Sequence, residues 1–513
     1  MQEITKTDDS TPTAVPRYVW VVLAVLAVFV YFFGLTIPFL GPDEARYAQV
    51  AREMMDRGDW VTPTLGGFHW FEKPALLYWL EIVSYKIFGV NEFAARFGPA
   101  LFGLGTVVSL WILGRSVEFD KKATSNGFAN YLALIAATTF GLIVFSRGAS
   151  FDIIVTFPMT AAMVSFFIFD RSTETSFREK HLPLILFYVF IGVSLLAKGL
   201  IGILFPIAIV AFYYVLSLRL PSRAFLFSLT WGTLLSCVIA AIWYLPVYQQ
   251  NGYEFVNEFF IQHHFQRFTS NKYQHPQPFY FFLWVLPLMT MPWLPFFFGA
   301  VWKTARVYIY RKNAESQDGS KPLLARSPLL LFTVAWMLVP LVFFSVSGSK
   351  LPGYILPAVP AAIVLTALFL YDLIRRKAQW RSRVMAIAVL TFCTVIGLLI
   401  FEVPKFAATD SVRSLLQAAN DRGFTSNRVL IMHTISHNAE FYATGRLLRE
   451  TDGKQRRLYG SGEVLAEIEA ENRTPVLVIV PIEYKTQLTK DTRLKTEFLK
   501  DNGELAIAAV SLP

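Results

Sequence analysis

Apolar stretches about as long as a bilayer is thick recur along the chain. A helix needs about 20 apolar residues to cross the hydrocarbon core of a membrane. Hydrophobic residues make up 54% of the chain and charged residues only 16%, whereas a soluble domain carries about 25% charged residues. A large soluble protein with several buried helices is thereby disfavoured. The sequence predicts an α-helical polytopic membrane protein with about eleven transmembrane helices, near residues 18–40, 95–114, 127–146, 151–169, 183–197, 199–218, 224–246, 279–301, 328–346, 354–373 and 384–401.

The net charge of +10 arises from Lys and Arg residues between the apolar stretches. Such clusters reflect membrane topology, so the charge does not indicate a nucleic-acid partner, which would need a continuous basic face. The distribution favours a cytoplasmic tail at 1–17, a retained first anchor, and a C-terminus outside. Cys237 and Cys393 both lie in apolar stretches, which argues against a disulfide framework and a cysteine metal site.

The distribution of polar residues predicts three regions. A transmembrane domain spans residues 18–401 and includes two long outward segments, 41–94 and 247–278. The first of these should contain a helix after residue 42, lying on the membrane surface, and a second helix around 73–88. Residues 402–513 have the composition of a soluble α/β domain, with buried strands at 428–433, 475–480 and 504–510.

Carboxylates occur at the outward ends of two predicted helices. Asp43 and Glu44 open the first outward helix, with Arg46 one turn on. Acidic residues in a first turn also complement the helix dipole, so this pair has a purely structural alternative. Asp152 lies at the outer end of an apolar helix, where an acidic residue usually faces a cavity or a partner; pairing with Arg147 is its structural alternative. By topology, Asp43 and Asp152 lie at similar depth and can meet.

Cationic and imidazole groups occur in the same outward connections. Lys73 follows Glu72 at a helix start, and a lysine at membrane level can bind a lipid phosphate as a point charge. One histidine of the pair at 263–264 can join Glu72 as a metal ligand, although a solvated loop is the alternative. Further candidates for phosphate binding, each also explicable as an interfacial anchor, are Lys198, Arg267, Lys350 and Tyr354. Because all these groups map to one face, that face suits a general base beside a phosphate leaving group.

Several short motifs resemble the signature of the aminoarabinose transferases, bacterial inner-membrane enzymes that modify lipid A in lipopolysaccharide. The resemblance covers most of residues 40–365, and the broader relatives are GT-C glycosyltransferases, including protein O-mannosyltransferases. It rests on residues 41–48 (GPDEARYA), 52–54 (REM), 58–60 (GDW), 71–74 (FEKP), 197–199 (AKG), 264–268 (HFQRF), 292–294 (PWL), 343–345 (FFS) and 350–357 (KLPGYILP).

This resemblance implies a GT-C transmembrane catalytic domain at 18–401 and an undecaprenyl-phosphate-linked sugar donor. It implies an inverting transfer on the periplasmic side of the inner membrane, and Asp43 as the catalytic base with Glu44 and Asp152 beside it. Glu72 and His264 match positions where the family can hold a zinc ion. The residues expected to bind the donor phosphate are Lys73, Arg267 and Tyr354, supported by Lys198, Lys350 and Arg46.

The chain departs from the well-known lipid A enzymes after residue 357, where it has about two fewer predicted membrane helices before the tail. This departure bears on the identity of the acceptor more than on the chemistry of the donor. The expected function is transfer of 4-amino-4-deoxy-L-arabinose or a related sugar from undecaprenyl phosphate to lipid A or another periplasmic acceptor. Alternatives are a protein or glycan glycosyltransferase of the same fold, a multi-pass lipid or solute transporter, and a catalytically silent lipid-binding scaffold.

Overall fold

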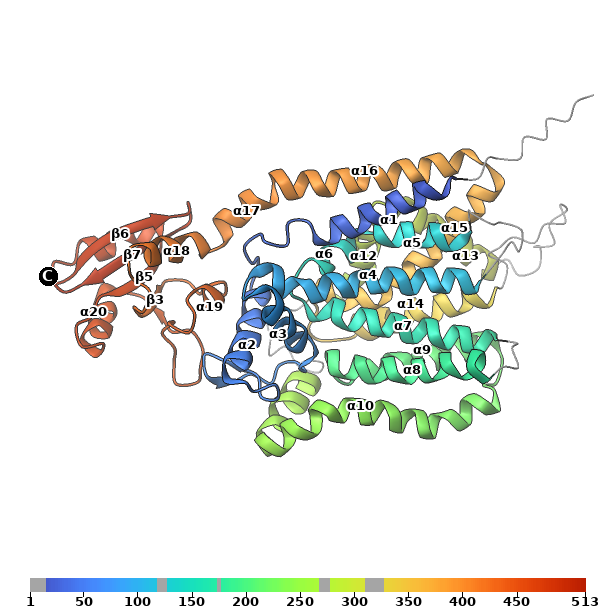
Figure 1. The fold of residues 1–513 in the computed structure, drawn as a ribbon, viewed down its shortest axis with the longest axis horizontal. Coiled ribbons are helices and arrows are strands. Elements are labelled where there is room, and N and C mark those ends of the chain that lie inside the picture. Colours follow the sequence, from blue (N-terminus) through green and yellow to red (C-terminus); the bar gives the residue numbers. More distant parts are fainter. Residues whose placement is uncertain (1–14, 118–126, 173–176, 267–276, 310–326) are drawn as a thin grey trace, which may run out of the picture.

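The computed structural model of the chain describes residues 15–117, 127–172, 177–266, 277–309 and 327–513. Apolar helices run side by side to form an elongated bundle, and a small sheet domain extends from one end of it (Figure 1). We call this end, which also carries the polar segment between α1 and α4, the domain end. The bundle helices are α1 (Arg17–Phe32), α4 (Glu92–Ser116), α5 (Phe128–Ala137), α6 (Phe140–Ser146), α7 (Phe151–Arg171), α8 (Phe177–Lys198), α9 (Ile201–Ser217), α10 (Arg223–Phe255), α12 (Phe281–Met289), α13 (Leu294–Ile309), α14 (Pro328–Ser345), α15 (Val359–Arg376) and α16 (Gln379–Phe401).

The predicted class of fold, a polytopic helical membrane protein, is confirmed. Within the described residues, seven helices are long and apolar enough to cross a membrane, or up to nine if each of two bent pairs counts as one span. The pair α5 and α6 bends by 56°, and the pair α12 and α13 bends by 118°. The stretch at 279–301, predicted as a single crossing, is therefore sharply broken. The total of about eleven spans stays a prediction.

The first polar segment folds into two helices and a hairpin at the domain end. Helix α2 (Asp43–Arg57) ends at Gly58, which has a left-handed conformation, and α3 (Leu76–Phe88) follows the short hairpin β1 (Thr64–Leu65) and β2 (Phe68–His69). The apolar face of α2, including Tyr47, Val50 and Met54, is buried. It packs against α3 and the sheet domain, so this face contacts protein where the sequence had suggested a membrane surface.

Helix α10 carries the chain to the second polar segment. Its backbone is non-helical at Gly252, where φ is 56° and ψ is −134°. Beyond this kink the chain continues as a π-helix, η1 (Val256–Gln266). Phe255 and Phe259 stack on each other and pack against Trp243 of α10, and this cluster holds η1 against the end of the bundle.

The C-terminal region forms a five-stranded sheet in the order β4-β3-β5-β7-β6. Strands β3, β4 and β5 are parallel to one another, and β7 is antiparallel to β5 and β6. The three predicted strands correspond to β3, β5 and β7, whereas the half-exposed β6 and the two-residue β4 were not predicted. Helices cover both faces of the sheet. The elements of this region are α17 (Val403–Asp410), α18 (Arg413–Asp421), β3 (Val429–Met432), α19 (Ala439–Tyr442), β4 (Arg457–Leu458), α20 (Ser461–Ala470), β5 (Val476–Pro481), η3 (Ile482–Tyr484), α21 (Lys485–Thr489), β6 (Lys495–Asp501) and β7 (Leu505–Ser511).

Short helix α19 fastens the sheet domain to the bundle. The Tyr442 hydroxyl donates a hydrogen bond to Glu92 (2.8 Å) and accepts one from the Phe39 backbone N–H (2.9 Å). Arg52 of α2 donates to the Phe441 carbonyl (3.0 Å), and its guanidinium lies 3.9 Å from the centre of the Phe441 ring. These contacts place the loops around α19 directly over α2.

Candidate active site

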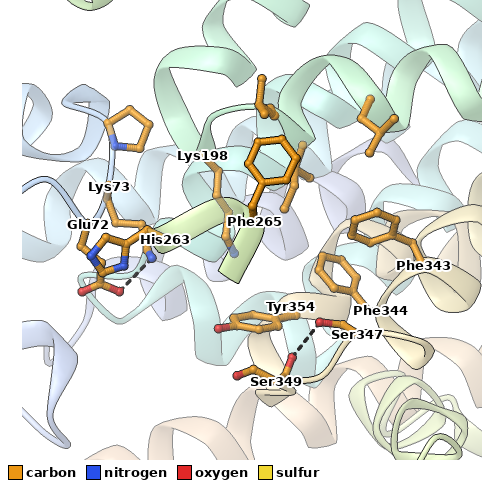
Figure 2. Close-up of a pocket in the computed structure, with 14 residues that line it drawn as sticks. Glu72, Lys73, Lys198, His263, Phe265, Phe343, Phe344, Ser347, Ser349 and Tyr354 are labelled. Atoms are coloured by element: carbon orange, nitrogen blue, oxygen red, sulfur yellow. Dashed lines mark hydrogen bonds and ion pairs between the residues drawn. The ribbon is translucent and has the colours of Figure 1, made fainter. Parts of the chain in front are cut away.

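An apolar cavity of about 300 Å³ opens at the domain end of the bundle. Segments that are far apart in sequence enclose it: the residues before α3, the α8–α9 turn, η1, the end of α14 and the following turn. Figure 2 shows Glu72, Lys73 and His263 grouped at one side and Phe343 and Phe344 at the other. The lining residues are Glu72, Lys73, Pro74, Lys198, Leu200, Ile201, Leu204, His263, Phe265, Phe343, Phe344, Ser347, Ser349 and Tyr354.

Two lysines bring positive charge to this mainly apolar cavity. The Lys73 ammonium donates a hydrogen bond to the Glu72 carboxylate at 2.9 Å. The Lys198 ammonium, at the C-terminal end of α8, forms an ion pair with Asp152 in the first turn of α7. Lys198 also lies 5.1 Å from the centre of the Tyr354 ring. The structure therefore brings three predicted phosphate-binding residues to one cavity.

The turn before α15 packs closely against the ion pair of Asp152 and Lys198. A Cβ atom at Gly353 would overlap the Asp152 carboxylate, so only glycine lets this backbone approach so near. Gly353 lies in the 3₁₀ helix η2 (Pro352–Ala358), which also carries Tyr354 into the cavity. Arg147, the alternative partner of Asp152, instead donates hydrogen bonds to the carbonyls of Val30 and Phe33.

Lys350 lies in the same turn but is turned inward. Its ammonium donates hydrogen bonds to the carbonyl oxygens of Ser347 (2.6 Å) and Gln277 (3.1 Å), and its side chain is buried. Within the described residues, this turn contributes Ser347 and Ser349 to the lining of the apolar cavity. The geometry thus gives Lys350 the role of holding the turn.

Asp43 and Glu44 are neighbours in sequence with very different surroundings. The Asp43 carboxylate is 49% exposed and forms an ion pair with Arg46. Burial lowers the pKa of Arg46, but the nearby charges of Asp43 and Glu72 outweigh this and raise it above the ordinary value. Arg46 also donates to the Pro42 carbonyl and lies over the Trp70 ring. Asp43 is consequently held by a permanent cation while its carboxylate faces solvent.

The Glu44 carboxylate is almost fully engaged by hydrogen bonds. It accepts two from the buried Arg96 guanidinium, at 2.9 and 2.7 Å, and others from the backbone N–H groups of Leu40 and Ala149, at 2.9 and 2.8 Å. Four donors saturate the acceptor sites of a carboxylate. Glu44 therefore ties α2 to α4 and to the α6–α7 connection.

The predicted metal pair falls partly outside the described structure. The side chain of His264 lies outside the described part of the chain, as does Arg267, which was predicted to bind the donor phosphate. Glu72, the other predicted metal ligand, faces the Lys73 ammonium. Where side chains are described, no three His, Cys, Asp or Glu residues converge as metal ligands. An ammonium beside Glu72 does not favour a cation there, and zinc binding stays a prediction.

A second cavity, of about 440 Å³, lies between the bundle and the sheet domain. We call it the polar cavity. Glu72 and His263 line both cavities, so the two spaces adjoin at these side chains. The polar cavity is lined by Arg46, Leu65, Phe68, His69, Trp70, Phe71, Glu72, Glu258, Gln262, His263, Ile435, His437, Glu440, Arg449, Asp452, Gly453, Lys454 and Gln455.

Several lining residues were not singled out from the sequence. His263 belongs to a histidine pair, and the sequence does not show which of the two faces Glu72. Phe343 and Phe344 were quoted only as part of a motif, yet they form the apolar wall of the first cavity. His437 and Arg449 come from loops of the sheet domain, and no local pattern marks these loops as part of a site.

Comparison with known proteins gives consistent matches. The sequence profile of the dolichyl-phosphate-mannose-protein mannosyltransferases matches residues 21–254. The chain is 32% identical over 370 residues to the undecaprenyl phosphate-α-4-amino-4-deoxy-L-arabinose arabinosyl transferase of Aeromonas salmonicida, covering 70% of this chain and 61% of that protein. The protein of the same name from Serratia proteamaculans is 30% identical over 372 residues, covering 72% and 61%. The chain thus spans about three fifths of the length of these curated relatives.

The fold matches a solved structure over nearly its whole length. The crystal structure of ArnT from Cupriavidus metallidurans bound to undecaprenyl phosphate superposes with a TM-score of 0.73 at 21% identity, covering 95% of this chain and 97% of that one. Its apo structure superposes with a TM-score of 0.72. At this identity the likeness establishes the shared fold.

The fold and the sequence matches define a multi-pass membrane protein with the GT-C fold. By sequence, the chain is similar to the undecaprenyl phosphate-aminoarabinose arabinosyl transferases over about three fifths of their length. The resemblance noted in the sequence motifs is confirmed.

Proposed function

We propose that this protein is an inverting glycosyltransferase that moves a sugar from undecaprenyl phosphate to lipid A or another periplasmic acceptor. The sugar is 4-amino-4-deoxy-L-arabinose or a close relative. The proposal places the protein in the bacterial inner membrane, with the domain end facing the periplasm. The single observation that carries it is the apolar cavity with Lys73, Lys198 and Tyr354 together in its wall.

The chemistry of this cavity suits the phosphate end of a lipid carrier. Leu200, Ile201 and Leu204 give it an apolar side, which suits isoprene units. Ammonium groups in a site that is shielded from water stabilise a phosphate strongly. Lys73 and Lys198 would therefore bind the phosphodiester of the donor and stabilise the charge that develops as the phosphate leaves.

Asp43 is the proposed general base. It takes the proton from an acceptor hydroxyl, and the freed oxygen forms a new bond to the anomeric carbon of the sugar. The bond from that carbon to the phosphate oxygen breaks, and its electron pair leaves with undecaprenyl phosphate. Attack opposite the leaving group inverts the anomeric centre. Arg46 holds the Asp43 carboxylate in position.

The other two predicted carboxylates have positioning roles in this proposal. Asp152 holds the Lys198 ammonium at the cavity through their ion pair. Glu44 fixes the start of α2, and hence Asp43, through Arg96 and two backbone N–H groups. This assignment differs from the catalytic role that the sequence suggested for Glu44 and Asp152.

The proposal is tested with purified protein, labelled undecaprenyl-phosphate-aminoarabinose and lipid A. Label that moves to lipid A with the wild type, and no longer does so with Lys198→Met, is the expected result. Donor binding without transfer to any glycolipid or protein acceptor would contradict the assigned reaction. A lack of donor binding by folded protein would contradict the assigned cavity.

A further inference from the structure

A third cavity lies on the outer surface of the bundle, close to its domain end. Its volume is about 440 Å³, and α10, the α8–α9 turn and the first part of η1 enclose it. Figure 1 shows α10 at the edge of the bundle, packed against α8. The cavity opens at this edge, because its lining residues Leu245 and Tyr248 are 54% and 53% exposed. We call it the outer groove.

Small side chains form the floor of the outer groove, and larger ones form its walls. Ala240 and Ala241 leave a hollow on α10, and Tyr244 follows one turn further along. The Tyr244 hydroxyl donates a hydrogen bond to the Leu195 carbonyl (3.0 Å), which ties this wall to α8. The ring of Phe260, from η1, lies 6.1 Å from the Tyr244 ring. Contacts within the protein therefore shape the groove, and its form does not depend on an occupant.

The lining of the outer groove suits a hydrocarbon chain. None of its described residues is charged, and the Tyr244 hydroxyl already has a partner. A peptide or a lipid headgroup inside the groove would leave polar groups without hydrogen bonds, which is costly in an apolar medium. A hydrocarbon chain has no such groups, and it gains dispersion contacts along the walls.

The outer groove lies at the depth of lipid acyl chains. Just beyond it α10 becomes polar, because Gln249 and Gln250 are exposed and Gln250 accepts a hydrogen bond from Thr62 (2.9 Å) in the polar segment of the domain end. Tyr248 lies at this boundary, and tyrosines are typical of the membrane–water interface. In the opposite direction, Ile242 continues an exposed apolar surface along α10. The groove thus faces the part of a bilayer just below the headgroups.

The chain of the sugar donor has a different wall available. In the proposed function its first isoprene units lie along Ile201 and Leu204, which line the apolar cavity and not the outer groove. Leu200 lines both spaces, so they adjoin there. The described lining of the outer groove offers no cation for the phosphate of the donor or of lipid A. A bilayer phospholipid needs none, because its headgroup stays hydrated at the membrane surface while one chain enters the groove.

Helix η1 connects the outer groove to the apolar cavity. Val256 and Phe260 of this helix belong to the wall of the groove, whereas His263 and Phe265 line the apolar cavity. A chain that packs on Val256 and Phe260 favours the position of η1 that completes the apolar cavity. Thermodynamic linkage then requires the chain and the donor to increase each other's affinity.

We propose that the outer groove binds one acyl chain of a phospholipid from the periplasmic leaflet, and that this chain holds η1 in the position that completes the donor site. The coupling to the donor rests on the proposed function, whereas the lipid site does not require sugar transfer. The inference makes the surrounding bilayer a determinant of donor affinity.

Crosslinking tests which chain occupies the groove. The protein is placed in nanodiscs of phosphatidylethanolamine that carries a diazirine in one acyl chain, and crosslinked residues are mapped by mass spectrometry. We expect crosslinks to concentrate on residues 237–260, compared with the exposed face of α16. Ala241→Trp fills the groove and should remove this excess, whereas Ala386→Trp, at an exposed position of α16, should not. An even distribution over α10 and α16 would overturn the proposal.

Competition identifies the source of the chain. Unlabelled undecaprenyl phosphate should increase crosslinking at the groove, as linkage requires, and unlabelled lipid A should leave it unchanged. Displacement of the crosslinks by undecaprenyl phosphate would assign the groove to the donor chain, and displacement by lipid A would assign it to the acceptor. Either displacement would overturn the assignment to phospholipid. Neither experiment involves sugar transfer, so a failure of the proposed reaction is distinguishable from a failure of this site.

The coupling is measured as affinity for fluorescent undecaprenyl phosphate in the same nanodiscs. Ala241→Trp should weaken binding roughly five- to tenfold, at the lower end of typical couplings between sites, and Ala386→Trp should match the wild type. Folding of each variant is checked by Tm, and Ala241→Leu provides a smaller filling of the groove. Unchanged donor affinity in a folded variant that has lost the crosslinks would overturn the coupling.

Discussion

The Arg96 guanidinium holds the Glu44 carboxylate through two hydrogen bonds, at 2.9 and 2.7 Å, where α4 passes the start of α2. The same guanidinium donates to the carbonyl oxygens of Leu35, Ile37 and Pro38. Arg96 therefore fixes both the chain that leaves α1 and the first turn of α2. That turn carries Asp43, so the pair controls where the proposed base lies.

This pair should be essential for stability. Arg96→Met leaves the Glu44 carboxylate without its cation, and breaking a buried ion pair in this way costs about 3–5 kcal/mol. We expect a large fall in Tm of the detergent-solubilised protein, measured by thermal unfolding. Lys405→Met, which removes an exposed cation beside Glu402, is the control and should leave Tm nearly unchanged. Equal Tm values for the two variants would contradict the assigned role.

Lys198 should act on the donor. Lys198→Met removes a charge-assisted contact to phosphate, worth about 1.5–3 kcal/mol, so affinity for undecaprenyl phosphate should fall roughly 10- to 100-fold. The matched control is Lys303→Met, because Lys303 forms a comparable ion pair with Asp372 (2.5 Å) at the opposite end of the bundle. Binding is measured with fluorescent undecaprenyl phosphate. A similar loss of binding in both variants would mean that the effect is general destabilisation.

His437 should make stability depend on pH. Burial, followed by the nearby charge of Arg46, lowers the pKa of His437 below its ordinary value of 6.5, and Asp43 opposes this only in part. The unfolded chain consequently takes up a proton before the folded protein does. The stabilising contribution of neutral His437 is complete above pH 6.5 and is lost as pH falls through the lower folded-state pKa.

The check is thermal unfolding of the wild type and His437→Gln between pH 8 and pH 5. Tm of the wild type should fall more steeply below pH 6.5 than Tm of the variant, and the two curves should run parallel above it. Parallel curves over the whole range would show that His437 titrates alike in the folded and unfolded states.

The Tyr442 hydroxyl should hold the sheet domain against the bundle. Tyr442→Phe removes the hydrogen bonds to Glu92 and Phe39 and leaves the buried Glu92 carboxylate with Arg413, 3.1 Å away. We expect a loss of about 1–3 kcal/mol and faster hydrogen exchange in residues 435–455. Tyr459→Phe, at an exposed site of the same domain, should leave exchange unchanged. Unchanged exchange in Tyr442→Phe would contradict this role.

The sequence was sufficient to predict the helical bundle, the sheet domain and the end of the molecule where the polar groups gather. These features follow from apolar length and charge placement, which are local properties. It also suggested Lys73, Lys198 and Tyr354, and the structure brings these three to one cavity.

The partners of individual side chains could not be predicted. Glu44 and Asp43 are adjacent in sequence, yet their surroundings depend on Arg96 and Arg46 and on how α4 passes α2. The polar cavity depends on the docking of a domain whose residues 435–455 are some 400 positions from α2. Such contacts are set by tertiary packing, and no short pattern specifies them.

The most direct test of the central claim is sugar transfer by Asp43→Asn, measured with labelled undecaprenyl-phosphate-aminoarabinose and lipid A alongside donor binding. Loss of a general base slows transfer by about 10²- to 10⁴-fold. We predict a loss of that size with donor affinity and Tm unchanged, because the Asp43 side chain is half exposed. Full transfer activity in the folded Asp43→Asn protein would contradict the account.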